Sequence, residues 1–139
     1  DGHLIIEPFE DELARKNGGY DLRIGKIASF TSKSAYTHTD QPTKFQEFES
    51  LIVAPNQRIL FLTLERVAFP KDMVAEIYLR SRYSQLFNMS QHMGKVKQGW
   101  EGNLILEICN FSLDRPVQIA YGEPLVCLDI FCLDMPSKT

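Results

Sequence analysis

Residues 99–110 read GWEGNLILEICN, a stretch with two glycines around a tryptophan followed by an apolar run that contains one glutamate. After the second glycine, side chains alternate between a fully apolar face and a mixed one, which is typical of a half-buried strand over Asn103–Cys109. The glycines on either side of Trp100 predict a tight backbone reversal with the indole packed across it. A β-hairpin with a core tryptophan is the alternative.

Glu107 is the residue of this strand that stands out. A carboxylate within an apolar strand is costly to bury unless it has a polar partner, and one held in that way can act as a general acid and base. An outward-facing, solvated glutamate is the alternative. The strand pattern places three apolar side chains on one face, namely Leu104, Leu106 and Ile108, and Ile105, Glu107 and Cys109 on the other.

The rest of the chain has the rhythm of an all-β fold, because short apolar runs alternate with Pro, Gly and Asn and no helical period is sustained. One short N-terminal helix is expected over Glu10–Lys16, closed by Asn17-Gly18-Gly19. This rhythm favours a barrel or a sandwich. Further strands are expected at Ile5–Phe9, Tyr20–Ile24, Ser50–Val53, Ile59–Leu64, in a run ending at Val67–Phe69, and at Met73–Leu79, Pro116–Ala120 and Leu125–Phe131.

A chain of 139 residues fits one domain, residues 1–139. The formal net charge of −3 gives no general attraction to polyanions, so we expect no nucleic-acid partner. No apolar run approaches the roughly 20 residues of a membrane-crossing helix, and we expect no membrane partner. Residues 1–8 lack the pattern of a signal peptide, which favours a cytoplasmic location.

Cysteines and histidines give no metal or redox motif. Cys109, Cys127 and Cys132 lack paired spacing and are expected to be buried thiols. The histidines do not cluster in the sequence and are expected at the surface; they are His3, His38 and His92. A polar stretch, Thr31–Gln46, predicts a surface loop whose length is compatible with a functional flap.

Arg80-Ser81-Arg82 follows an expected strand directly. Two guanidinium groups and a hydroxyl at a strand end can bind a phosphate, since arginine forms bidentate hydrogen bonds with phosphate oxygens. A charged corner without a ligand is the alternative.

Taken in order, four blocks of the sequence resemble the dCTP deaminase and dUTPase superfamily. Residues 18–25, GGYDLRIG, look like the family's early strand with a buried aspartate. Residues 65–74, ERVAFPKDMV, are similar to its E-x-V-x-x-P-x-D-L-V segment. Arg80-Ser81 follows this segment, where the family has its phosphate-binding Arg-Ser pair. The third block, 99–110, resembles the deaminase pattern G-W-x-G-x-x-x-L-E-x-x-N, and residues 117–125, VQIAYGEPL, fit the closing strand and turn.

The resemblance implies a dUTPase-like β-clip, a distorted, jelly-roll-like barrel that assembles as a homotrimer with sites between subunits. It implies hydrolytic deamination of dCTP to dUTP without zinc, with Glu107 activating water and magnesium carried by the nucleotide triphosphate. No metal ligand is expected from the protein, and zinc deaminases use His and Cys pairs. The residues expected to bind the nucleotide and its phosphates are Arg80, Ser81, Arg82 and Gln85, and those forming a wall of the site are Gly99 and Trp100.

The chain departs from the family at several positions. The pattern R-S-S-x-A-R reads RSRYSQ at residues 80–85, so Arg82 replaces a serine and Gln85 an arginine, and an R-I-D-P-like segment reads KVKQ at 95–98. Three hypotheses therefore stay open. The first is a divergent dCTP deaminase, the second a catalytically degenerate member that acts as a nucleotide-binding or protein-interaction trimer, and the third a pyrophosphatase of dUTPase type, for which Lys97 offers no base.

Overall fold

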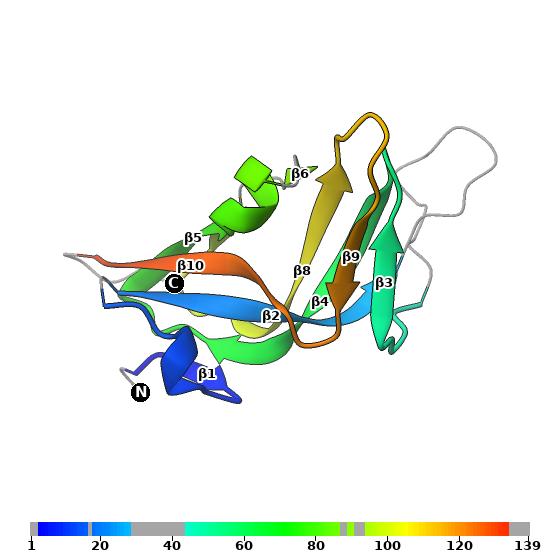
Figure 1. Ribbon diagram of the computed structural model, residues 1–139. Coiled ribbons are helices and arrows are strands. Elements are labelled where there is room, and N and C mark those ends of the chain that lie inside the picture. The colour runs from blue at the N-terminus through cyan, green and yellow to red at the C-terminus, as the bar shows by residue number, and fades with distance from the viewer. Residues whose placement is uncertain (1–2, 17, 29–43, 87–88, 91–93, 134–139) are drawn as a thin grey trace, which may run out of the picture.

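A computed structural model describes residues 3–16, 18–28, 44–86, 89–90 and 94–133 of the chain. In this part of the chain the elements are almost all strands, as expected for an all-β fold (Figure 1). The strands are β1 (Ile5–Glu7), β2 (Gly19–Ala28), β3 (Ser50–Val53), β4 (Arg58–Ala68), β5 (Met73–Leu79), β6 (Met89–Ser90), β7 (Gly94–Val96), β8 (Glu101–Asn110), β9 (Val117–Ala120) and β10 (Pro124–Cys132).

Eight of these strands form one antiparallel sheet in the order β6-β8-β4-β2-β10-β5-β7, with β1 also paired to β4. The sheet curls into a half-barrel, and β3 pairs with β9 in a separate two-stranded sheet beside it (Figure 1). The expectation of a dUTPase-like, jelly-roll-like all-β fold is confirmed. Curling brings residues far apart in sequence to the inside, where they share one core.

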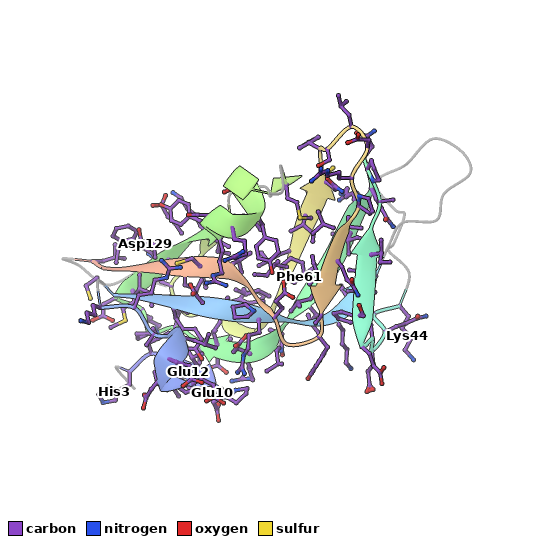
Figure 2. All side chains as sticks on the ribbon, in the orientation of Figure 1. His3, Glu10, Glu12, Lys44, Phe61 and Asp129 are labelled. Atoms are coloured by element: carbon purple, nitrogen blue, oxygen red, sulfur yellow. The ribbon has the colours of Figure 1, made fainter. Side chains whose placement is uncertain are left out.

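The core consists of the inward-facing residues of both sheets. Phe61 on β4 is fully buried, and Figure 2 shows it within the curled sheet, while His3, Glu10 and Glu12 project from the N-terminal end. Alternation along the strands produces this sorting, because successive side chains point to opposite faces. No helix in the described residues is long and apolar enough to cross a membrane.

The N-terminal helix is shorter than predicted. Only a single 3₁₀ turn, η1 (Asp11–Leu13), forms within the expected range Glu10–Lys16. Ala14 already makes a β-bridge to Tyr20, and Arg15 donates its backbone N–H to the Gly19 carbonyl at 2.8 Å. Pairing with the start of β2 therefore ends the helix before the sequence signal does.

β2 continues past Gly25, where the sequence predicted its end. A register shift between Ile24 and Lys26 keeps the strand paired to β4. A Cβ at Gly25 would lie only 2.9 Å from the backbone of Leu64. The glycine thus marks a close approach of two strands rather than a turn.

The Gly-Trp segment reverses the chain without forming a hairpin. β7 pairs with β5, whereas β8 pairs with β4 and β6. Gly99 and Gly102 have φ of +77° and +135°, and the indole of Trp100 lies 3.7 Å from where a Cβ of Gly102 would be. The predicted reversal with the indole across it is confirmed, but Trp100 is 44% exposed, so the alternative of a core tryptophan is wrong.

Two further expectations change. The prediction that all three cysteines are buried is wrong, since Cys132 is exposed and Cys109 and Cys127 are half-buried. Of the expected loop Thr31–Gln46, residues 31–43 lie outside the described residues, and Gln46 forms a bridge to Ile27. His3 is exposed, as expected, and His38 and His92 lie outside the described residues.

Candidate active site

The outer face of β8 carries Glu107. Leu104 and Ile108 are buried, whereas Ile105 is 59% exposed and the Glu107 side chain 17% exposed. The two faces predicted from the alternation are therefore confirmed. Glu107 is neither enclosed in the core nor fully solvated, since the surface around it shields most of its side chain.

Arg58 is the ion-pair partner of Glu107. The guanidinium of Arg58 donates its Nε–H to Oε2 of Glu107, and the contact reaches from the first residue of β4 to the neighbouring strand. In the register of β4 with β8, Leu60 lies opposite Glu107 and Arg58 opposite Cys109. The pair is thus a diagonal cross-strand contact on the outer face.

Cys109 lies on the same face, one alternation beyond Glu107. Burial raises the pKa of the Cys109 thiol, the negative charge of Glu107 raises it further, and the positive charge of Arg58 lowers it. The thiol is therefore within electrostatic reach of both members of the ion pair.

The end of β5 places Arg80 against a buried carboxylate. Asp21 on β2 is buried, and its Oδ2 lies 3.3 Å from Arg80 Nε, while its Oδ1 accepts a hydrogen bond from Arg15 Nε at 2.9 Å. Another guanidinium nitrogen of Arg80 donates to the Pro124 carbonyl at 3.3 Å. The Arg80 side chain is only 33% exposed, so its guanidinium is oriented by β2 and β10.

Ser81 and Arg82 lie directly after Arg80 and are exposed. Arg82 begins a π-helical turn, η2 (Arg82–Leu86), in which Tyr83 is buried and donates its backbone N–H to the Arg80 carbonyl at 3.0 Å. The backbone of Gln85 belongs to this turn, and its side chain lies outside what the structure describes.

The η2 turn lies beside β6, and β6 pairs with the end of β8, at Cys109 and Asn110 (Figure 1). The segment with Ser81 and Arg82 is therefore near the end of β8 that follows Glu107. The polar contacts that orient Arg80 come from β2 and β10, whereas Arg58 on β4 orients Glu107. Arg80 and Glu107 are therefore oriented by different strands of the same chain.

A cleft of about 430 Å³ adjoins the outer face of β8, and it is lined by Lys95, Val96, Lys97, Trp100, Asn103, Leu104 and Ile105. Trp100, one of the two residues predicted to form a wall of the site, lines this cleft, and Gly99 does not. Ile105 shares its face of β8 with Glu107, roughly 7 Å further along the strand. A volume of this size is in the range that holds a small-molecule ligand.

A larger cleft of about 650 Å³ lies over the bulge where Gly25 approaches Leu64, and none of the predicted site residues lines it. Phe48 and Tyr121 form one side of it, with their rings edge to face and centroids 6.1 Å apart. Size alone therefore does not identify the site, and of the predicted site residues that the structure describes only Trp100 lines the smaller cleft.

Among the described residues, no group of three or more His, Cys, Asp or Glu side chains could hold a metal ion. Along β8 the charged groups of the described residues include the pair Glu107–Arg58, the pair Glu101–Arg66 and the two lysines of the cleft. This set fits an anion such as a polyphosphate better than a bare cation, and a magnesium ion would have to arrive with its own phosphate ligands.

Arg58 is the residue of this site that sequence reasoning missed. It lies 49 positions before Glu107, and only the β4–β8 register brings the two together. The one signal in the sequence was an arginine after a turn, at the start of an apolar strand, which is common at strand ends.

Comparisons with known proteins identify the family of the chain. The family model described as dCTP deaminase-like matches residues 1–131. The chain is similar to the dCTP deaminase of Thermococcus gammatolerans, with 34% identity over 135 residues that cover 97% of this chain and 79% of the relative.

Two solved structures share the fold. One is the 2'-deoxycytidine 5'-triphosphate deaminase from Agrobacterium tumefaciens, with a TM-score of 0.70 and 16% identity, covering 91% of this chain and 43% of that one. The other is a variant of the dUTPase from Staphylococcus aureus phage phi11, described with a structural Mg(II) ion, with a TM-score of 0.63 and 17% identity, covering 99% and 95%. Family-model match, sequence identity and fold together show that the chain belongs to the dCTP deaminase-like family, among proteins of deoxynucleotide metabolism.

Proposed function

We propose that the chain is a hydrolase that deaminates dCTP to dUTP, with Glu107 as its catalytic residue. The observation that carries the proposal is the position of Glu107, a shielded and arginine-paired carboxylate on the outer face of β8. Two residues earlier on the same face, Ile105 lines a cleft large enough for a nucleotide base and sugar. Family membership supplies the substrate class.

In this mechanism the Glu107 carboxylate removes a proton from a water molecule as the water oxygen bonds to C4 of the cytosine. The protonated Glu107 then delivers that proton to the exocyclic amine, the C4–N bond breaks, and ammonia leaves. The proton that remains on the oxygen at C4 moves to N3, which gives the uracil ring. Proton transfer by a positioned carboxylate contributes typically 10²- to 10⁴-fold to rate. The balance is dCTP plus water giving dUTP plus ammonia, so the protein needs no redox partner.

The triphosphate is expected to contact the exposed Ser81 and Arg82, with Arg80 and Gln85 nearby, and Gly99 and Trp100 border the base. Charge-assisted hydrogen bonds from guanidinium to phosphate are among the stronger ones in proteins. Magnesium, bound to the triphosphate, would neutralise part of its charge. This assignment rests on exposure and position at the end of β5.

We further infer that residues 1–139 act as one domain that assembles as a homotrimer. Support comes from the outer face of β8 and the turn before it, because Ile105 is 59% and Trp100 44% exposed. A neighbouring subunit would cover these apolar groups and exclude water from the site, which strengthens electrostatic interactions there. Light scattering on the purified protein tests this, and a monomeric mass under assay conditions would contradict it.

The first experiment is ammonia release with product analysis, using dCTP and magnesium. The wild type is expected to form dUTP, and Glu107→Gln to lose the activity by at least about a hundredfold. Glu101→Gln is the matched control, because Glu101 lies on the same strand, is 65% exposed and pairs with Arg66 at 2.9 Å. Equal activity in Glu107→Gln and the wild type would overturn the assignment.

The second candidate function is that of a catalytically degenerate member that binds a nucleotide or a protein partner. The observation in its favour is Arg80, whose guanidinium is engaged by Asp21 and Pro124. Binding of dCTP without turnover of dCTP or dUTP would support it. A dUTPase-type pyrophosphatase ranks third because Lys97, in the cleft, takes the place of an acid.

A further inference from the structure

We propose that Arg58 is a positioning residue for Glu107 and fixes the carboxylate in the orientation in which it meets the water. The inference rests on the proposed function and assigns a residue to it that the family motifs do not contain. Its basis is the hydrogen bond from Arg58 Nε to Glu107 Oε2, made from β4 to β8 on the outer face of the sheet.

The geometry suits orientation better than sheet stabilisation. Arg58 is the first residue of β4, directly after the turn at Ala54–Gln57, in which Gln57 donates its N–H to the Ala54 carbonyl at 3.0 Å. The turn and the Asn56 N–H bond to the Asn110 carbonyl at 2.7 Å fix the start of β4 against the end of β8. Arg58 thus reaches Glu107 from a rigid anchor while its own side chain is 47% exposed.

At residues 80–85 the chain has Gln85 where the pattern R-S-S-x-A-R ends in an arginine, and Arg58 supplies a guanidinium to Glu107 from a different strand. The guanidinium engages Oε2 of Glu107 on the face of β8 that also carries Ile105, which borders the cleft. A fixed carboxylate loses less entropy on reaching the transition state, and a misplacement of about 1 Å can cost about a hundredfold in rate.

The chain supplies a matched control. Arg66 pairs with Glu101 between the same two strands, at 2.9 Å, and its side chain is 46% exposed. Arg66→Met therefore removes a comparable surface ion pair from the same pair of strands without touching the proposed site. If Arg58→Met lowers kcat and Arg66→Met does not, the loss is due to the contact of Arg58 with Glu107 and not to the removal of a surface ion pair in general.

The kinetic test compares kcat and KM for dCTP in the wild type, Arg58→Met, Arg58→Lys and Arg66→Met. Arg58→Met is expected to lower kcat by about a hundredfold with KM within about twofold, and Arg58→Lys to recover part of kcat. Arg66→Met is expected to leave both unchanged. A rise in KM with constant kcat would overturn the inference, since it would make Arg58 a substrate contact, and so would equal effects of the two methionine variants.

A second readout does not depend on turnover. Because Cys109 lies within electrostatic reach of both residues, its alkylation rate at pH 8, followed by peptide mass spectrometry, reports their charges. Arg58→Met is expected to slow the alkylation of Cys109 about threefold, and Glu107→Gln to speed it about threefold. The rate in the double variant is expected to differ from the product of the two single effects, because the two side chains interact. Independent effects would show that the two side chains do not interact and would overturn the inference. Absence of dCTP turnover in the wild type, with coupled alkylation rates, would instead overturn the proposed function alone.

Discussion

Arg23 on β2 donates two hydrogen bonds to the carboxylate of Glu65 on the neighbouring strand β4. Oε1 of Glu65 accepts the backbone N–H of Arg23 at 2.9 Å, and Oε2 accepts the side-chain Nε–H at 2.7 Å. Glu65 is completely buried and the Arg23 side chain only 16% exposed. Such a pair contributes little net stability when intact, yet it becomes costly when one partner is removed.

Arg23→Met is therefore expected to lower the free energy of unfolding by about 3–5 kcal/mol, because Glu65 would remain buried without the guanidinium that donates to its Oε2. Urea unfolding followed by circular dichroism measures the change. The double variant Arg23→Met with Glu65→Leu should recover most of the loss. A loss in the single variant no larger than about 1 kcal/mol would contradict the prediction.

Gly25 is expected to tolerate no side chain. Its Cβ would meet Leu64 backbone atoms at 2.9 Å, so Gly25→Ala must push β2 away from β4 and is expected to cost about 1–3 kcal/mol. Gly122→Ala is the comparison, since Gly122 has φ of +77° and open space around its Cα, so only local backbone strain of about 1 kcal/mol applies. Equal losses in thermal unfolding would show that the close approach is unimportant.

The half-buried thiols make stability fall at high pH. Burial raises the pKa of Cys109 and of Cys127 above the ordinary value of 9.0, so the folded state holds these protons more tightly than the unfolded state. The contribution of the two protonated thiols to the free energy of unfolding is complete below pH 9, and it is lost as the pH rises through their higher pKa values in the folded state. Urea midpoints between pH 8 and 10.5 measure this, and a Cys109→Ala, Cys127→Ala variant should show a shallower fall. An identical fall in both proteins would assign it to other groups.

Two neighbouring arginines should separate binding from stability. Arg82→Met is expected to weaken dCTP binding about tenfold, as for one lost charge-assisted hydrogen bond, with unchanged unfolding. Arg80→Met is expected to lower stability as well, because the buried Asp21 would lose one of its two cations. Calorimetric titration with dCTP measures the affinity, and urea unfolding measures the free energy of unfolding. Unchanged affinity in Arg82→Met would exclude a phosphate contact there.

Much of the fold was predictable because local rules decide it. The period of two along β8 placed Glu107 on the face of Ile105 and Cys109, and the bounds of β3 and β5 matched their predicted runs. The predictions that were wrong depended on distant contacts. η1 is short because Ala14 pairs with Tyr20, and β7 and β8 form no hairpin because each pairs with another strand.

The sequence by itself determined the all-β class, the strand faces, the reversal around Trp100 and the motifs that indicate the family. These features depend on neighbours within a few residues, where backbone geometry and alternation act directly. Tertiary structure alone decided that Arg58 meets Glu107, that Arg23 encloses Glu65 and that Arg80 is oriented by Asp21. Strand order and register bring these pairs together, and both are set by the packing of the whole sheet, which no single segment encodes.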